Sequence, residues 1–578
     1  MFKKQIAIFP LALMLGISFS GFSQEKEGEE EKDLETEVVE IVKPYTPNVA
    51  DAFKIKETPV LNDTVSSKKK PVRYSISSIP VASTFSPEKG RAAKMDRVKR
   101  EKIYDNYATL GFGNYTTLLG ELYANFEISK TDNVGFFFQH NSTQGKMKDV
   151  ILDHKAYDTQ LDAHYSSRQK NATYKLDFGA EHQLSNWYGL MKNAENYFPV
   201  ESLARLNPEQ NYFSVYGGGS VAFNHSFFEK ASLNLRYLGD SFSSSEFRAT
   251  FVPEFAFEIE EVELIIDADV DYLTGSFDRS FATNDGINYG FLSVGVAPSI
   301  LFSVEDLHVS LGVAGFVEMN LEHDESEFAL FPRVDVSYRL DHAALLYAGV
   351  DGGSKLNSYY GFKELNPFIS PTLYMEPAKT TYDGFAGIKG KVANMVTYGL
   401  RASYGNEIHK PLFKSNPVHS IASNEKSYQY GNSFHVVYDE VNTLSIFGEL
   451  EVEISKIASI GVNVNYFNYS TDEESQAWNL PNIKASLFSN FNITDELYGG
   501  ASIFFVGERK DVSSLNTFEE VTLDPYVDAN VHFGYRINDQ FTAFVKGSNL
   551  FGDNYTKWQD YPVQGIQGLI GVTYKFDW

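Results

Sequence analysis

The chain contains no cysteine in 578 residues. Without cysteine it can be neither an acylated lipoprotein nor a secreted module held together by disulfides. Beyond its N-terminus it also lacks any run of 18 apolar residues, so no segment is long enough for a membrane-spanning helix. Methionine and tryptophan are scarce, at 8 and 4 residues, beside 46 Phe and 35 Tyr. An excess of Phe and Tyr favours pleated and interfacial surfaces, and it predicts an all-β chain.

Basic residues are also fewer than acidic residues. Lysine and arginine number 50 against 76 aspartates and glutamates, which gives a formal net charge of −26 at pH 7. Nucleic acids and anionic membrane surfaces repel an acidic protein. We therefore expect no nucleic-acid partner.

No catalytic constellation is recognisable in the sequence. The 12 histidines include no His-Glu-x-x-His pair, the serines include no Gly-x-Ser-x-Gly, and Gly217-Gly218-Gly219 falls in a predicted strand rather than before a helix. Acid-rich connections such as residues 322–327 lack the Asp-x-Asp-x-Asp-Gly spacing of a calcium loop. We predict no enzyme activity, no metal site and no cofactor.

Residues 1–23 have the pattern of a secretory signal peptide. Lys3 and Lys4 precede a mostly apolar run over residues 6–19, and small residues follow at Gly21 and Ser23. Residues 24–104 then form a second region, which is acidic over residues 25–40 and basic over residues 89–102. The sequence predicts an exported protein with a charged segment before its main domain.

From residue 105 onward the chain alternates apolar and polar residues over eight or more positions at a time. The last nine residues alternate without an error, and the apolar face carries Ile570, Val572, Tyr574, Phe576 and Trp578. Short polar turns separate these segments in alternation with longer loops, which is typical of an antiparallel barrel with one periplasmic and one extracellular rim. We count about 22 strands, taking residues 434–454 as one strand. Residues 105–578 are therefore predicted to form a transmembrane β-barrel of the outer membrane, in contact with its lipids.

Acidic residues gather on the polar face of two predicted strands, and that face should line the lumen. The candidate lumen residues are Glu263, Asp267, Asp269, Asp271, Glu449, Glu451 and Glu453. Carboxylates that line a pore select cations; the alternative is that they only keep the lumen hydrated. The aromatic connection over residues 357–375 has two interpretations as well, a contact for sugars or a surface lipoprotein, or part of an interfacial girdle.

The C-terminal region resembles that of TonB-dependent receptors, in particular those of Bacteroidota. The resemblance rests on Gly547-Ser548-Asn549-Leu550-Phe551-Gly552-Asp553-Asn554-Tyr555, on Gly568, and on Gly571-Val572-Thr573-Tyr574-Lys575-Phe576. It implies uptake of a siderophore, cobalamin or glycan, driven by a TonB-type energy transducer in the periplasm. It also implies that the barrel-insertion machinery recognises the terminal aromatics Tyr574, Phe576 and Trp578.

The N-terminal region departs from that family, because no plug domain is recognisable before the first strand. Residues 51–102 are basic at their end, and we expect them to fold into the acidic lumen as a reduced plug. The hexamer Glu37-Val38-Val39-Glu40-Ile41-Val42 is either an energy-coupling box, able to add to a partner's sheet edge, or a chance apolar pattern. Three functions stay open: energised or gated uptake, a plugless scaffold or subunit of an envelope complex, and a passive channel.

Overall fold

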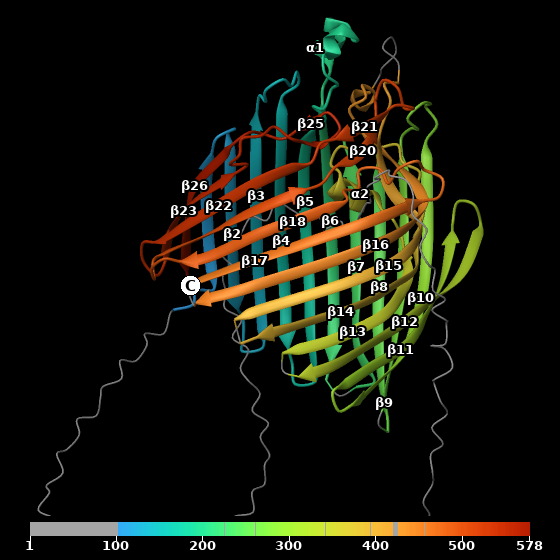
Figure 1. The fold of residues 1–578 in the computed structure, drawn as a ribbon, viewed down its shortest axis with the longest axis vertical. Helices are drawn as coiled ribbons and strands as arrows, with labels where there is room; N and C mark the ends of the chain where they lie inside the picture. The colour runs from blue at the N-terminus through green and yellow to red at the C-terminus, as the bar shows by residue number, and fades with distance from the viewer. Residues whose placement is uncertain are drawn as a thin grey trace, which may run out of the picture. The chain divides into compact units, whose positions relative to one another are not determined.

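A computed structural model describes residues 102–578 apart from 225, 261, 342, 394, 420–425 and 456. Within these residues 22 strands form one antiparallel sheet, and β1 (Asn106–Gly113) pairs with β26 (Gln567–Phe576) to close it into a barrel (Figure 1). The predicted all-β barrel of 22 strands is confirmed. The predicted signal peptide, the hexamer at residues 37–42 and all of the predicted reduced plug except Lys102 lie outside the described residues.

The remaining elements follow in chain order. They are β2 (Thr117–Glu127), β3 (Asp132–Gly145), β4 (His154–Arg168), β5 (Ala172–Asn186), η2 (Ala194–Asn196), α1 (Val200–Arg205), β6 (Glu209–Phe223), β7 (Phe228–Asp240), β8 (Ser245–Ile259), β9 (Val262–Phe277), β10 (Ile287–Val304), β11 (Leu307–Asn320), β12 (Glu325–Asp341), β13 (Ala344–Lys355), α2 (Tyr359–Leu365), β14 (Ala378–Val392), β15 (Val396–Ser415), η3 (Ser427–Gln429), β16 (Phe434–Ser455), β17 (Ala458–Thr471), β18 (Ile483–Asn492), β19 (Leu497–Val506), β20 (Arg509–Val512), β21 (Glu520–Leu523), β22 (Tyr526–Arg536), β23 (Phe541–Ser548), β24 (Thr556–Trp558) and β25 (Tyr561–Pro562). The pairs β20–β21 and β24–β25 form two small sheets of their own.

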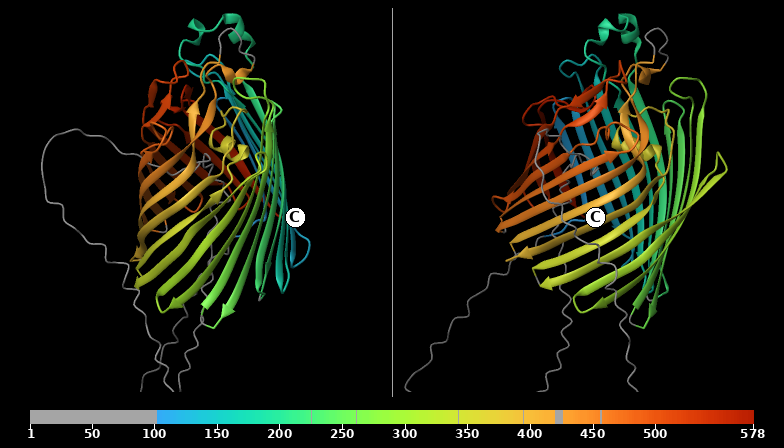
Figure 2. Two further views of the ribbon diagram at one scale, coloured as in Figure 1. Left: turned by 90° about the vertical axis from the view of Figure 1, so that its right-hand side faces the viewer. Right: turned by 45° about the vertical axis from the view of Figure 1, so that its right-hand side comes forward.

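The two rims of the barrel differ as the sequence predicts. Connections at one rim are short, for example residues 305–306 and 493–496, whereas those at the other rim are long and carry both α-helices and the two small sheets (Figure 2). The long strand predicted over residues 434–454 is a single strand, β16. Both described ends of the chain lie at the short-turn rim, where Lys102 pairs with Asp577 at 2.8 Å. In outer-membrane barrels short turns are periplasmic and long loops extracellular.

The outer face of the barrel carries exposed apolar side chains. On the closing strands these include Phe112 and Ile570, which are 61% and 65% exposed. So much apolar surface is stable only when lipid rather than water surrounds it. None of the helices in the described part of the chain has the length and hydrophobicity to cross a membrane.

Candidate functional site

The acidic residues that the sequence predicts for the lumen lie on β9 and β16. Three of them form ion pairs with other strands: Asp271 with Arg248 of the adjacent strand at 2.5 Å, Asp267 with Arg333 three strands away at 3.3 Å, and Glu453 with Lys391 two strands away at 3.3 Å. The other four, for which no ion pair occurs among the described residues, are Glu263, Asp269, Glu449 and Glu451. Seven strand steps separate β9 from β16 in the barrel. The candidate acids therefore form two groups on different parts of the wall and not one ring.

The connection between β13 and β14, residues 356–377, folds into the mouth of the barrel, and we call it the inward segment (Figure 2). It carries α2, in which Tyr359 is fully buried and Phe362 nearly so. Leu356, Phe362, Ile369 and Leu373 pack in one cluster with side chains of β6, β7, β9, β10 and β15. Burying a side chain of this size contributes about 1.5–3 kcal/mol, which explains why the segment leaves the water. Most aromatic side chains of the segment are thus turned away from lipid and do not form an interfacial girdle, and among them only Tyr374 is largely exposed.

One carboxylate of the wall holds the first turn of α2. Glu246 of β8 accepts the backbone N–H groups of Tyr359 at 2.6 Å and Tyr360 at 3.0 Å, and the Tyr289 hydroxyl at 2.8 Å. Ser358 caps the same turn by accepting the N–H of Gly361 at 3.0 Å. These bonds use backbone donors that a helix start leaves free. Glu246 is therefore the main polar attachment between the inward segment and the barrel wall.

A second attachment surrounds Arg236 of β7. Its guanidinium lies between the rings of Tyr216 and Tyr360, 4.3 and 4.0 Å from their centroids, and donates to Glu181 at 3.2 Å. The Tyr360 hydroxyl donates to the same carboxylate at 3.1 Å. Burial, then the neighbouring carboxylates of Glu364 and Glu181, raise the pKa of Tyr360 well above its ordinary value. Tyr360 is therefore a neutral donor at physiological pH.

Lys363, on the next turn of α2, adds a third attachment. Its ammonium group, which is almost inaccessible to solvent, donates to Gln183 of β5 and to Glu364, each at 2.7 Å. A buried charge is stable only when it is paired and hydrogen-bonded. Charged groups of β5, β7 and β8 thus position one short helix.

Above α2 three aromatic residues and one asparagine join four extracellular connections. We call these four residues the mouth cluster: Tyr188, Phe368, Asn432 and Tyr561. The Tyr561 ring stacks on Phe368 with centroids 3.6 Å apart and meets Tyr188 at 4.9 Å. Its hydroxyl donates to the Asn432 carbonyl at 2.6 Å, and Asn432 donates to the Trp187 carbonyl at 2.9 Å. Connections far apart in sequence therefore close together over the inward segment.

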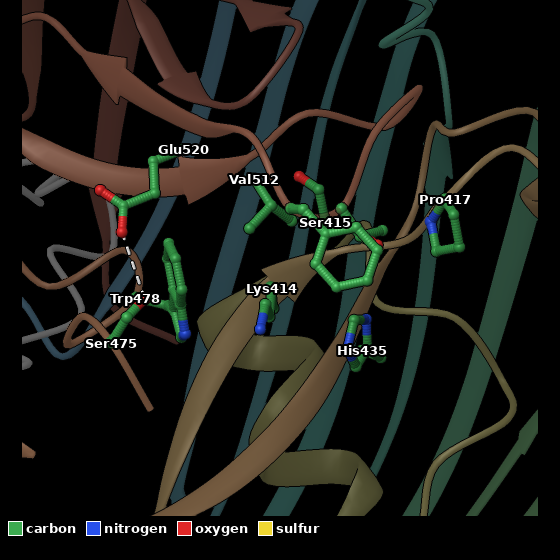
Figure 3. A pocket seen from close by; sticks show the side chains of 10 residues that line it. Lys414, Ser415, Pro417, His435, Ser475, Trp478, Val512 and Glu520 are labelled. Atoms are coloured by element: carbon green, nitrogen blue, oxygen red, sulfur yellow. Dashed lines mark hydrogen bonds between the residues drawn. The ribbon is translucent and has the colours of Figure 1, made fainter. Parts of the chain in front are cut away.

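A cavity of about 490 Å³ lies among the extracellular connections, beside the ends of β15 and β16 (Figure 3). Lys414, His435, Trp478 and Glu520 are among the side chains that line it. Lys414 pairs at 3.0 Å with a carboxylate that also accepts the Trp478 indole N–H at 2.6 Å. The Nδ1 atom of His435 is buried without a hydrogen-bond partner. The cavity is large enough for a small ligand.

In the described residues no group of three or more His, Asp or Glu side chains is placed to hold a metal ion. The terminal aromatics, in contrast, do lie together at the periplasmic rim. Trp578 stacks on Phe126 at 5.1 Å and meets Phe576 at 5.3 Å, while Tyr574 stacks on Phe541 at 4.6 Å. They form a continuous aromatic surface beside the barrel closure.

Sequence reasoning missed the residues that close the mouth. The composition of the connection could have predicted its burial. A 22-residue connection that contains Leu356, Phe362, Ile369 and Leu373 is too apolar for a solvated loop. The wall residues Glu246, Arg236 and Glu181 gave no signal, because each occupies an ordinary polar position of an alternating strand. Only the fold brings them to the helix.

No family model and no curated protein matches the sequence. Its fold does match solved structures. The FrpB iron transporter from Neisseria meningitidis aligns with a TM-score of 0.63 and 10% identity, over 82% of this chain and 82% of that chain. The siderophore receptor PirA from Acinetobacter baumannii gives 0.59 and 13%, over 82% and 81%. The chain has the barrel fold of a siderophore receptor.

The ferric-catecholate import receptor Fiu from Escherichia coli K12 agrees, with a TM-score of 0.58 and 10% identity over 82% of each chain. The predicted resemblance to a TonB-dependent receptor barrel is thus confirmed at the level of the fold. A closed barrel of 22 strands with an apolar outer face resides in the outer membrane. The matched structures are those of transporters and receptors.

Proposed function

We propose that this protein imports a ligand across the outer membrane through a passage that the inward segment gates at the extracellular mouth. The supporting observation is how α2 is held. Its contacts with Glu246, Arg236 and Glu181 are charge-assisted hydrogen bonds to the wall, and water or a ligand can replace such bonds without unfolding the barrel. Beneath α2 the lumen face is polar and charged. The proposal involves no catalysis.

The periplasmic side of the proposal concerns the N-terminal segment. Residues 51–102 would fill the lumen as a reduced plug, and residues 37–42 would engage a TonB-type energy transducer. Charge and position support this. The ion pair of Lys102 with Asp577 anchors the chain at the periplasmic rim. The sequence just before Lys102 is basic, whereas four of the candidate lumen carboxylates form no ion pair within the part of the chain that the structure describes. The ligand would first meet the extracellular loops, where the cavity beside His435 lies. A surface lipoprotein partner stays a prediction.

Conductance in planar bilayers tests the gate. We expect the double variant Glu246→Ala/Arg236→Ala to release α2, and the matched variant Tyr374→Ala, on the exposed part of the same segment, to leave it in place. Each is measured in the full chain and in a chain lacking residues 51–101. Steady conductance, at least about tenfold above the parent, is expected only when both barriers are removed, because the barrel interior is otherwise wide enough for an aqueous channel.

Each arm of the experiment has a distinct meaning. If the chain lacking residues 51–101 conducts steadily without the double variant, the inward segment does not close the mouth, and the proposal that it is a gate is wrong. If the double variant conducts in the full chain, residues 51–101 do not plug the lumen. If neither change nor their combination yields conductance, the closure does not depend on these contacts, which contradicts the proposal.

A second candidate function, a scaffold or subunit of an envelope complex, is favoured by one observation. The closure is deeply buried, with Trp187, Tyr359 and Tyr561 almost inaccessible to solvent. A permanently closed barrel transports nothing and serves as a fixed body in the membrane. A passive channel, the third possibility, would conduct without any variant.

A further inference from the structure

The wall of the barrel is incomplete on its extracellular side between β12 and β13. β11 and β12 pair along their whole length, from Leu307↔Tyr338 to Asn320↔Glu325. The pairing of β12 with β13, however, ends at Arg333↔Asp351. Residues 325–332 of β12 therefore have a partner strand on one side only. Figures 1 and 2 show the yellow-green β11–β12 hairpin projecting away from the neighbouring strands.

The inward segment explains the separation of the two strands. The register of β13 with β14 shifts between Asp351 and Gly353, where β13 bends. From there the chain continues into residues 356–377, which fold into the mouth. The end of β13 thus follows the inward segment while β12 stays with β11. The open edge is a consequence of how the mouth is closed.

Proline at the end of the shared ladder keeps the edge open. Arg339 of β12 donates its backbone N–H to the Asp306 carbonyl at 3.0 Å, on the β11 side. The backbone N–H and C=O groups point to alternate sides along a strand. In β12 those of odd-numbered residues therefore point towards β11. Those of even-numbered residues point towards β13 or, over residues 325–332, towards the open side. Pro332 is even-numbered and has no N–H to donate, so it cannot extend the ladder towards β13. The open edge then presents the N–H groups of Ser326, Phe328 and Leu330.

The two faces of the open edge differ in chemistry. Its outer face is apolar, with Phe328 and Leu330 63% and 62% exposed. Its inner face and tip are acidic, with Glu322, Asp324, Glu325 and Glu327. Lys379 of β14 forms ion pairs with Glu327 and, at 3.2 Å, with Glu318, and so brings one positive charge to this acidic surface. The edge is therefore negatively charged on the side that does not face lipid.

We propose that residues 325–332 of β12 are a docking edge for an extended segment of a partner protein at the cell surface, with basic residues alternating with apolar ones. Such a segment would add as a strand: its backbone would bond to Ser326, Phe328 and Leu330, its basic side chains would meet Glu325 and Glu327, and its apolar ones would cover Phe328 and Leu330. A strand edge with exposed apolar side chains is a template for pairing. A second copy of this chain would bring like charges together, since its own edge is acidic.

The test uses the full chain in detergent micelles and a synthetic eight-residue peptide that alternates lysine with valine. Peptide binding is measured by fluorescence anisotropy, and hydrogen exchange reports the amides of β12. We expect slower exchange at Ser326, Phe328 and Leu330 when the peptide is bound. Leu330→Pro removes one edge donor but spares the β11 ladder, and Leu330→Ala removes the same side chain while keeping the N–H group. The proline variant should bind at least about tenfold more weakly than the alanine variant.

A second variant keeps the proposal testable if the proline disturbs the hairpin. Glu325→Gln/Glu327→Gln retains the edge but should weaken binding and flatten its dependence on salt. Equal binding by the proline and alanine variants, or equal binding of a peptide that alternates glutamate with valine, would overturn the proposal. Dimers of the chain that Leu330→Pro abolishes would identify a second copy as the occupant and would also overturn it.

Discussion

At the residue scale, the pKa of Asp560 predicts that the closure of the mouth depends on pH. Asp560 lies in the turn between β24 and β25, next to Tyr561 of the mouth cluster. Burial raises its pKa to about 6, above an ordinary aspartate value of about 3.9. A pKa raised in the folded state means that the protonated carboxyl favours the closed loop. The protonated carboxyl of Asp560 stabilises the closed loop fully below about pH 4, and this stabilisation is lost as the pH rises through 6.

We therefore predict that Asp560→Asn, which imitates the protonated carboxyl, protects the loop at neutral pH. Limited proteolysis of residues 549–566 measures this, and the ratio of wild-type to variant cleavage rates removes the protease's own pH dependence. The ratio should be near one at pH 4 and should rise towards a limit on the order of a hundredfold above pH 7. Asparagine tolerates the left-handed backbone at this position, where φ is 61°. A ratio that is flat with pH would contradict the role of Asp560.

At the element scale, the end of β26 and Trp578, two residues beyond it, carry the terminal aromatics to which the family resemblance assigns barrel insertion. Trp578 is 75% exposed in the folded barrel, and its stacking on Phe126 is worth only about 0.5–1.5 kcal/mol. Deleting Trp578 should therefore leave refolding into detergent almost unchanged but lower the amount of folded barrel in outer membranes severalfold. Heat-dependent gel mobility of membrane fractions measures that amount.

The control for this prediction is Trp578→Phe, which keeps a terminal aromatic and should restore insertion. If deletion impairs refolding in detergent as much as insertion in cells, Trp578 acts through stability and not through recognition. Equal insertion with and without Trp578 would exclude both roles.

Elements of this protein differ in how far the sequence predicts them. Strict alternation predicts β26, because a strand with one lipid face and one watery face must alternate. The single long strand β16 follows from the order of the rims, since dividing it would place the short turn at residues 455–456 on the long-loop rim. The inward segment was not predictable in the same way. Its position depends on Glu246, Arg236 and Glu181, which lie more than a hundred residues earlier in the chain, and on contacts that exist only once the barrel has closed. The lumen position of the candidate acids stays a prediction, and the pairing of Asp271 and Asp267 with Arg248 and Arg333 depends on strand register, which alternation alone does not predict.

At the scale of the whole molecule, a barrel of receptor size is closed from outside by its own loops. A receptor of this kind needs a periplasmic energy source to open a closed passage, whereas a scaffold does not. Import and scaffolding therefore differ in one measurable property of the full chain, which is whether its N-terminal segment engages a TonB-type transducer.

We predict that the full chain binds the purified periplasmic domain of the transducer through residues 37–42. Such a short segment adds as a strand to the partner's sheet edge through backbone bonds, and alternate side chains select the partner. Deleting residues 37–42 should weaken binding at least about tenfold in surface plasmon resonance. The matched control scrambles the order of the same six residues, which preserves composition and charge. Binding that survives both changes would show that residues 37–42 are not the coupling segment. A full chain that does not bind at all would favour the scaffold, because a closed barrel without coupling has no means of moving Tyr360 away from Arg236 and Glu181.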